Sequence, residues 1–115
     1  MPLWSSDKCT TYTEAQQFCA RQYAKRGPKL IAGVSQHLEL LAEVKDPVDS
    51  LKVLYDLNDL SIDLSCFNPE WNDFSLVVFE NVLFPRSKTW MISALKTSYD
   101  NTLRRLEHSG TEPGT

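Results

Sequence analysis

Apolar side chains recur at steps of three and four residues along most of the chain, which is the spacing of amphipathic helices. The first stripe consists of Tyr12, Ala15, Phe18, Cys19 and Tyr23. Thr11 and Glu14 have the spacing of a capping box at its start, and Gly27-Pro28 is typical of a helix end. The sequence therefore predicts an irregular arm over residues 1–10 and a first helix from Thr11 to Gly27.

The middle of the chain predicts two further helices. A broad apolar face runs from about Pro28 to Val44. It contains Gly33, and the small size of glycine would allow another helix to approach closely there. Asp46-Pro47 then has the form of a helix start, with proline at the first helical position. We expect the helix that follows to end near Leu60. Its predicted core-facing positions are Val48, Leu51, Leu54, Tyr55 and Leu57.

The next segment is open to two interpretations. Residues 61–68 fit a short helical turn or a loop, after which Asn68-Pro69 repeats the start signal. An apolar run follows, and a helix buried on most sides is favoured for residues 74–84. A β-strand through Ser75–Phe79 also fits, because valine and phenylalanine favour strands.

A break at residues 85–88 precedes the last predicted helix, which covers residues 87–108. We expect residues 109–115 to form a flexible tail. Four or five amphipathic helices with short connections predict an all-α fold. The expected architecture is a compact four- to five-helix bundle, orthogonal or up-down, with residues 11–108 as its single domain.

Composition and charge narrow the class of protein. The chain has 115 residues, 42% of them hydrophobic and 23% charged, which is enough to bury one core. Its net charge of −3 is unevenly spread: residues 1–29 carry a net +3 and residues 39–63 a net −5. Because no secretion signal or membrane-length apolar run is present, we expect an intracellular protein of the cytoplasm or nucleus.

Candidate chemistry is sparse. The three cysteines, Cys9, Cys19 and Cys66, have irregular spacing and form no metal-binding motif with His37. A cysteine nucleophile needs a histidine base, and His37 and His108 are both expected at boundary or terminal positions. We therefore predict no catalytic residue, no metal and no cofactor, and a chain that is not an enzyme.

Two clusters are candidates for binding. The first is basic and contains Arg21, Lys25, Arg26 and Lys29. It suits phosphates or an acidic partner, although cations at the end of a helix also favour the helix dipole. The second is aromatic and surrounds the break at Pro85; its members are Trp71, Phe74, Phe79, Phe84 and Trp90. Core packing is its favoured interpretation, and the alternative is a partner-binding patch of Trp71, Phe74, Phe84 and Trp90.

The leucine spacing Leu51-x-x-Leu54-x-x-Leu57-x-x-Leu60-x-Ile62-x-Leu64 resembles the second conserved helix of TFIIS-type N-terminal domains, also called LW domains. The helix order from residue 30 to 107 is similar too. This resemblance implies a four- or five-helix bundle that docks short disordered motifs of nuclear regulators. The segment Asn68 to Phe84 departs from it, since the family's isoleucine-glycine-lysine step is missing there.

The sequence thus favours a non-enzymatic interaction or scaffold module that binds a partner helix or peptide, or a second copy of itself. The alternative is a nucleic-acid-binding accessory or regulatory protein, viral or nuclear, that uses a basic patch. The further cations available to it are Arg86, Lys88, Arg104 and Arg105. No membrane partner is expected.

Overall fold

The computed structural model describes residues 6–111, with side chains for residues 13–108. The elements are α1 (Ser6–Glu43), α2 (Pro47–Phe67), the single 3-10 turn η2 (Pro69–Trp71), α3 (Asn72–Leu83) and α4 (Lys88–Thr111). Residues 6–111 contain no strand, which confirms the predicted all-α fold for this part of the chain. The segment from Ser75 to Phe79 is helix, so the strand alternative is wrong.

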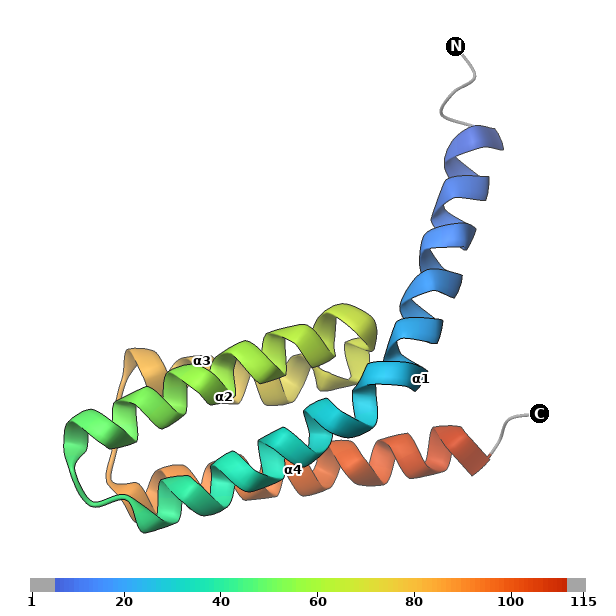
Figure 1. The fold of residues 1–115 in the computed structure, drawn as a ribbon. Helices are drawn as coiled ribbons and strands as arrows, with labels where there is room; N and C mark the ends of the chain where they lie inside the picture. Colours follow the sequence, from blue (N-terminus) through green and yellow to red (C-terminus); the bar gives the residue numbers. More distant parts are fainter. Residues whose placement is uncertain (1–5, 112–115) are drawn as a thin grey trace.

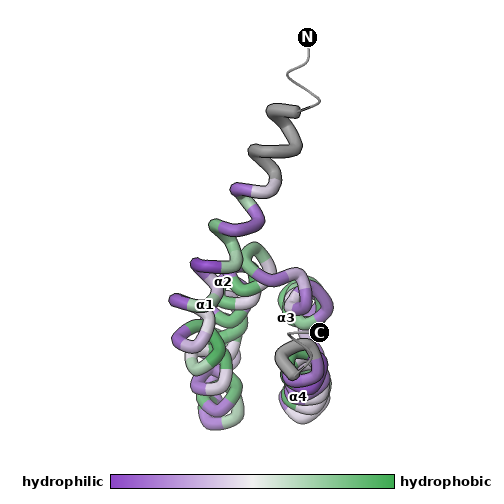
Figure 2. The backbone as a smooth tube through the Cα atoms, turned by 90° about the vertical axis from the view of Figure 1, so that its right-hand side faces the viewer, coloured by the Kyte–Doolittle hydropathy of each residue, from purple (hydrophilic) through white to green (hydrophobic). Residues whose placement is uncertain are grey.

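The four α-helices form an up-down bundle. Successive helices run antiparallel where they pack together, and α4 also packs on α1, which closes the bundle (Figure 1). Figure 2 views the bundle near its end, with α1 and α2 on one side and α3 and α4 on the other. The molecule extends over 56 × 35 × 20 Å, because part of α1 projects beyond the bundle.

Trp71 is the centre of the core. Its ring is fully buried, edge-on to Phe74 at 5.7 Å between centroids and tilted against Tyr99 at 6.0 Å. Its indole N–H donates a hydrogen bond to the Tyr23 hydroxyl at 3.2 Å. One side chain thus links η2 to α1, α3 and α4. Burial raises the pKa of the Tyr99 phenol; a hydrogen bond with Ser35 opposes this rise.

The prediction that α1 ends at Gly27-Pro28 is wrong. α1 is one helix of 38 residues with Pro28 inside it. A proline in a helix interior costs about 3 kcal/mol relative to alanine, so contacts from elsewhere must offset it. Gly27 is buried, and a Cβ there would lie 3.1 Å from the Tyr23 ring. Glycine therefore lets Tyr23 lie close over the backbone and reach Trp71.

The ends of the chain also differ from the prediction. α1 begins at Ser6, so the predicted irregular arm is wrong for residues 6–10, and residues 1–5 lie outside the described range. α4 continues to Thr111, so the predicted tail is helical for residues 109–111. Residues 112–115 lie outside the described range.

α2 is longer than predicted and packs closely on α1. It passes the expected end at Leu60 and stops at Phe67. Residues 61–67 of the segment left open between loop and helical turn are therefore part of this helix, and Asn68 follows it in an extended conformation. A Cβ on Gly33 would lie 3.4 Å from the Leu60 side chain. The predicted close approach of another helix at Gly33 is therefore confirmed.

Replacing Trp71 with phenylalanine should destabilise the fold by about 2 kcal/mol, because the change removes core volume and the hydrogen bond to Tyr23. Urea unfolding followed by circular dichroism measures this change. The matched control is Trp90→Phe, at a side chain that is 48% exposed, with an expected effect within about 0.5 kcal/mol. Equal effects of the two substitutions would contradict the central role of Trp71.

Replacing Pro28 with alanine should stabilise α1, because it restores a backbone N–H donor and relieves the clash with the preceding turn. Amide hydrogen exchange over residues 13–27 should slow by about tenfold or more, which corresponds to about 1.4 kcal/mol. The control is Pro47→Ala at the start of α2, where proline is favourable. Unchanged or faster exchange in P28A would contradict the prediction.

Candidate interaction surface

Seven of the eleven large hydrophobic side chains that the described residues expose lie on α2 and α3. Their exposed fractions range from 36% to 60%. We call them the α2–α3 surface: Val48, Leu51, Tyr55 and Ile62 from α2, and Leu76, Phe79 and Leu83 from α3. Each set follows helical spacing, so each forms one stripe along its helix.

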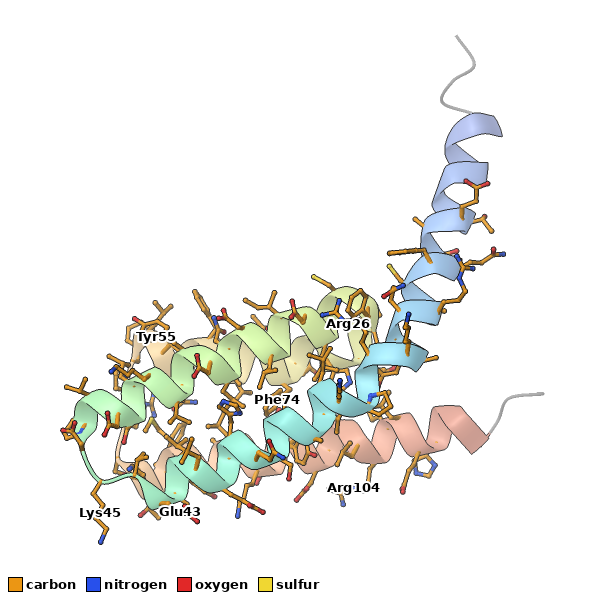
Figure 3. The ribbon with its side chains drawn as sticks, viewed as in Figure 1. Arg26, Glu43, Lys45, Tyr55, Phe74 and Arg104 are labelled. Atoms are coloured by element: carbon orange, nitrogen blue, oxygen red, sulfur yellow. The ribbon has the colours of Figure 1, made fainter. Side chains whose placement is uncertain are left out.

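The two stripes border the seam between α2 and α3. The flank of α2 that faces α1 is marked by Leu60, which packs near Gly33, and by Asp56, which lies 3.9 Å from His37. Helical spacing places the exposed stripe of α2 on the opposite flank, toward α3. Tyr55 accordingly points away from the bundle in Figure 3.

The stripe of α3 lies on the matching flank. Val77 and Asn81 face α4, because they line a groove together with Ala94 and Ser98 of that helix. Phe79 and Leu83 occupy the other flank, toward α2. Since α2 and α3 pack side by side, the two stripes lie on neighbouring helices.

Acidic side chains border this surface on both edges. All of them are exposed: Asp49, Asp56, Asp59 and Asp63 on α2, and Asp73 and Glu80 on α3. Lys52 is the one cation that α2 and α3 carry on their exposed positions. Two of these acids have a partner: Asp56 lies near His37, and Asp73 pairs with Arg105 at 3.6 Å. The salt bridges among the described residues include none of Asp59, Asp63 and Glu80. The surface is therefore apolar in the middle and strongly acidic at its edges.

A second concave feature lies between α3 and α4. It is a groove of about 740 Å³, and small polar residues of α4 such as Ser93 and Thr97 line one wall. Asn81 lines the other wall and is 3% exposed. Its Nδ2 donates to the Val77 carbonyl at 2.8 Å, whereas its Oδ1 is buried without a hydrogen-bond partner.

The structure divides the predicted aromatic patch. Trp71 and Phe74 are fully buried, so their assignment to a partner-binding surface is wrong and their core interpretation is right. Phe84 and Trp90 are 65% and 48% exposed and lie at one end of the α3–α4 groove. The Arg86 guanidinium stacks over the Trp90 ring at 4.4 Å. Half of the predicted patch is thus exposed, on a different face from the α2–α3 surface.

The predicted basic cluster is exposed, but its expected electrostatic role is wrong. Arg21, Lys25, Arg26 and Lys29 all lie on the exposed side of α1. Because α1 continues to Glu43, these residues are in the middle of a helix and compensate no C-terminal dipole. Arg26 stacks on the Phe67 ring at 5.2 Å and marks the bend of α1 in Figure 3.

The four additional cations of the nucleic-acid alternative do not gather in one patch. Arg86 and Lys88 lie at the start of α4, and Arg104 and Arg105 lie near its end, about 25 Å away at 1.5 Å per residue. Arg105 donates to Glu70 at 3.0 Å, and Lys88 donates to the Val44 carbonyl. Arg105 is neutralised by its acidic partners, and cations so far apart contribute little to a common phosphate-binding site.

The predicted cysteine and histidine positions show ordinary environments. Cys19 is partly buried, Cys66 is exposed, and both are free thiols; the side chain of Cys9 lies outside the described residues. His37 is hydrogen-bonded through Nδ1 to the Gly33 carbonyl at 2.8 Å. Among the described residues, no group of three or more His, Cys, Asp or Glu side chains is placed to hold a metal ion.

Sequence reasoning missed the α2–α3 surface because it assigned Val48, Leu51 and Tyr55 to the core. The structure corrects this, since all three are exposed. The expectation of a helix buried on most sides over residues 74–84 is wrong as well, because Leu76, Phe79, Leu83 and Phe84 are exposed. The signal was present in the sequence, since α2 carries apolar residues on more positions than one core-facing stripe requires. An apolar band that covers two flanks of a helix predicts a second contact.

Comparison with protein-family models, with curated proteins and with solved structures gives no match. None of the helices, over the residues that the structure describes, combines the length and apolarity needed to cross a membrane. The assignment of a function therefore depends on the surfaces described above.

Replacing Asn81 with leucine should raise the free energy of unfolding by about 1 kcal/mol, because it removes a buried carbonyl oxygen without a partner. Asn81→Asp keeps the shape and should lower stability, since it buries a charge in the same place. Chemical denaturation of both variants measures the difference. A loss of stability in N81L comparable to that in N81D would show that the Asn81 oxygen is satisfied in solution.

Proposed function

We propose that this chain is a non-enzymatic interaction module that binds an amphipathic helix of another protein on the α2–α3 surface. The observation that carries the proposal is the gathering of seven exposed large hydrophobic side chains on two adjacent helices. The largest apolar patch of a typical monomer is about 300–600 Å² and is often functional. The seven side chains are 36% to 60% exposed and lie on two helices that pack side by side.

The form of the surface favours a helix as the ligand. Each of the two antiparallel helices exposes apolar side chains at steps of three, four or seven residues, which is the spacing that an amphipathic helix offers in return. The exposed acids on both edges favour basic residues on the flanks of that helix. Docking of short motifs is also the role that the resemblance to LW domains implies.

A designed peptide tests the proposal. It is a helix with leucine at every third or fourth position and lysine on both flanks, and its control carries glutamate in place of each lysine. The lysine peptide should bind the full chain with an affinity that falls with salt, and the glutamate peptide should not bind. Isothermal titration calorimetry measures both. Failure of the lysine peptide to bind at low salt would refute the proposed function.

Two phenylalanines of α3 locate the binding site. Phe79→Ala should lower the affinity of the chain for the lysine peptide by about tenfold or more, since truncation of an interface anchor costs at least about 1.4 kcal/mol. Phe84→Ala is the matched control, because Phe84 is also exposed but faces the α3–α4 groove. If F84A weakened binding as much as F79A, the α2–α3 surface would not be the site.

A further inference from the structure

The chain itself contains a helical segment that carries an exposed apolar side chain close to positive charges. We call residues 13–26 of α1 the arm, since they project from the end of the bundle (Figures 1 and 2). Phe18 of the arm is 53% exposed, and Ala15 beside it is exposed as well. Arg21 and Lys25 follow at the same helical spacing and are exposed. The arm therefore presents an apolar anchor with adjacent positive charges.

Among the described residues, several charges of the arm and of the α2–α3 surface form no ion pair. None of the salt bridges among the described residues includes Arg21 or Lys25, and none includes Asp59 or Asp63. The arm cannot lie on its own α2–α3 surface, because its root is fixed to the end of the bundle. Tyr23 accepts the hydrogen bond from Trp71, and Arg26 stacks on Phe67.

From this complementarity we propose that the arm of a second copy of this chain occupies the α2–α3 surface, so that two copies exchange arms. The inference rests on the proposed function, for which it names the partner. Each copy offers both halves of the contact, so one two-fold axis generates two identical contacts. Phe18 enters the apolar seam, and Arg21 and Lys25 face the acidic edge that contains Asp59 and Asp63.

Charge also disfavours the simpler pairing of two α2–α3 surfaces. Both edges of the surface are acidic, so direct contact of two such surfaces brings like charges together. Contact with a basic helix neutralises the same charges. The observed charge distribution therefore selects the arm over the surface itself.

A charge exchange between two variants tests the contact. Variant A carries Arg21→Glu and Lys25→Glu on the arm, and variant B carries Asp59→Lys and Asp63→Lys on α2. In sedimentation velocity the wild-type chain should form dimers at low salt that dissociate at high salt. Variants A and B alone should each be monomers. Their equimolar mixture should form dimers again, because each arm then meets a surface of opposite charge.

Matched controls separate this contact from general charge effects and from misfolding. Lys96→Glu with Glu107→Lys alters exposed charges of α4 and should leave dimers unchanged. Phe18→Ala should reduce dimer formation without lowering thermal stability at high salt, because Phe18 is half exposed in one chain. Circular dichroism confirms that variants A and B are folded before they are mixed.

The outcomes distinguish the inference from the proposed function. A wild-type chain that stays monomeric at every concentration and salt overturns arm exchange, and so does dimer formation by variant A equal to that of wild type. If the lysine peptide still binds the monomer, the proposed function stands and its partner is another protein. If the peptide fails to bind as well, both are refuted. Dimers of wild type that the lysine peptide dissociates support the exchange.

Discussion

The contact between Trp71 and Tyr23 determines how the rest of the molecule is arranged. A buried indole N–H requires an acceptor, and the Tyr23 hydroxyl supplies it from a helix that is 48 residues away in the sequence. Tyr23 lies over Gly27 where it reaches Trp71, and α1 remains helical through Pro28. The contact fixes the root of the arm at the end of the bundle and directs the arm away from α4 (Figure 1). The exposure of the basic cluster follows from the same contact.

Local signals predicted those features that depend on neighbouring residues. Asp46-Pro47 and Asn68-Pro69 both start helices, and in each case the residue before proline is extended, as proline requires. Gly27-Pro28 carries an equally strong local signal, yet the helix continues. The difference lies in a tertiary contact that no window of adjacent residues contains. Helical periodicity therefore predicted the fold class, but it could not decide whether one helix or two helices precede Asp46.

The candidate site could be predicted only in part, for a related reason. Trp71 and Trp90 are equivalent by residue type and both adjoin a proline-containing segment, but Trp71 is fully buried and Trp90 is half exposed. Their burial depends on how each helix is rotated about its axis in the bundle. Periodicity locates an apolar stripe without showing which side of a wide stripe faces the core. The same limit explains why Tyr55 was assigned to the core, although the excess of apolar positions on α2 indicated a second contact.

The acidic edges of the α2–α3 surface have two consequences that arise from one charge distribution. An exposed apolar patch of this size favours self-association, and the carboxylates along both edges oppose direct pairing of two such patches. The same carboxylates attract a helix with positive flanks, at close range and less strongly as salt rises. In the proposed complex, we assign affinity to the apolar side chains and the choice of partner to Asp59, Asp63 and their neighbours. A mutation of the apolar side chains should therefore lower the affinity for every ligand, while a charge change at the edges should alter which ligand binds.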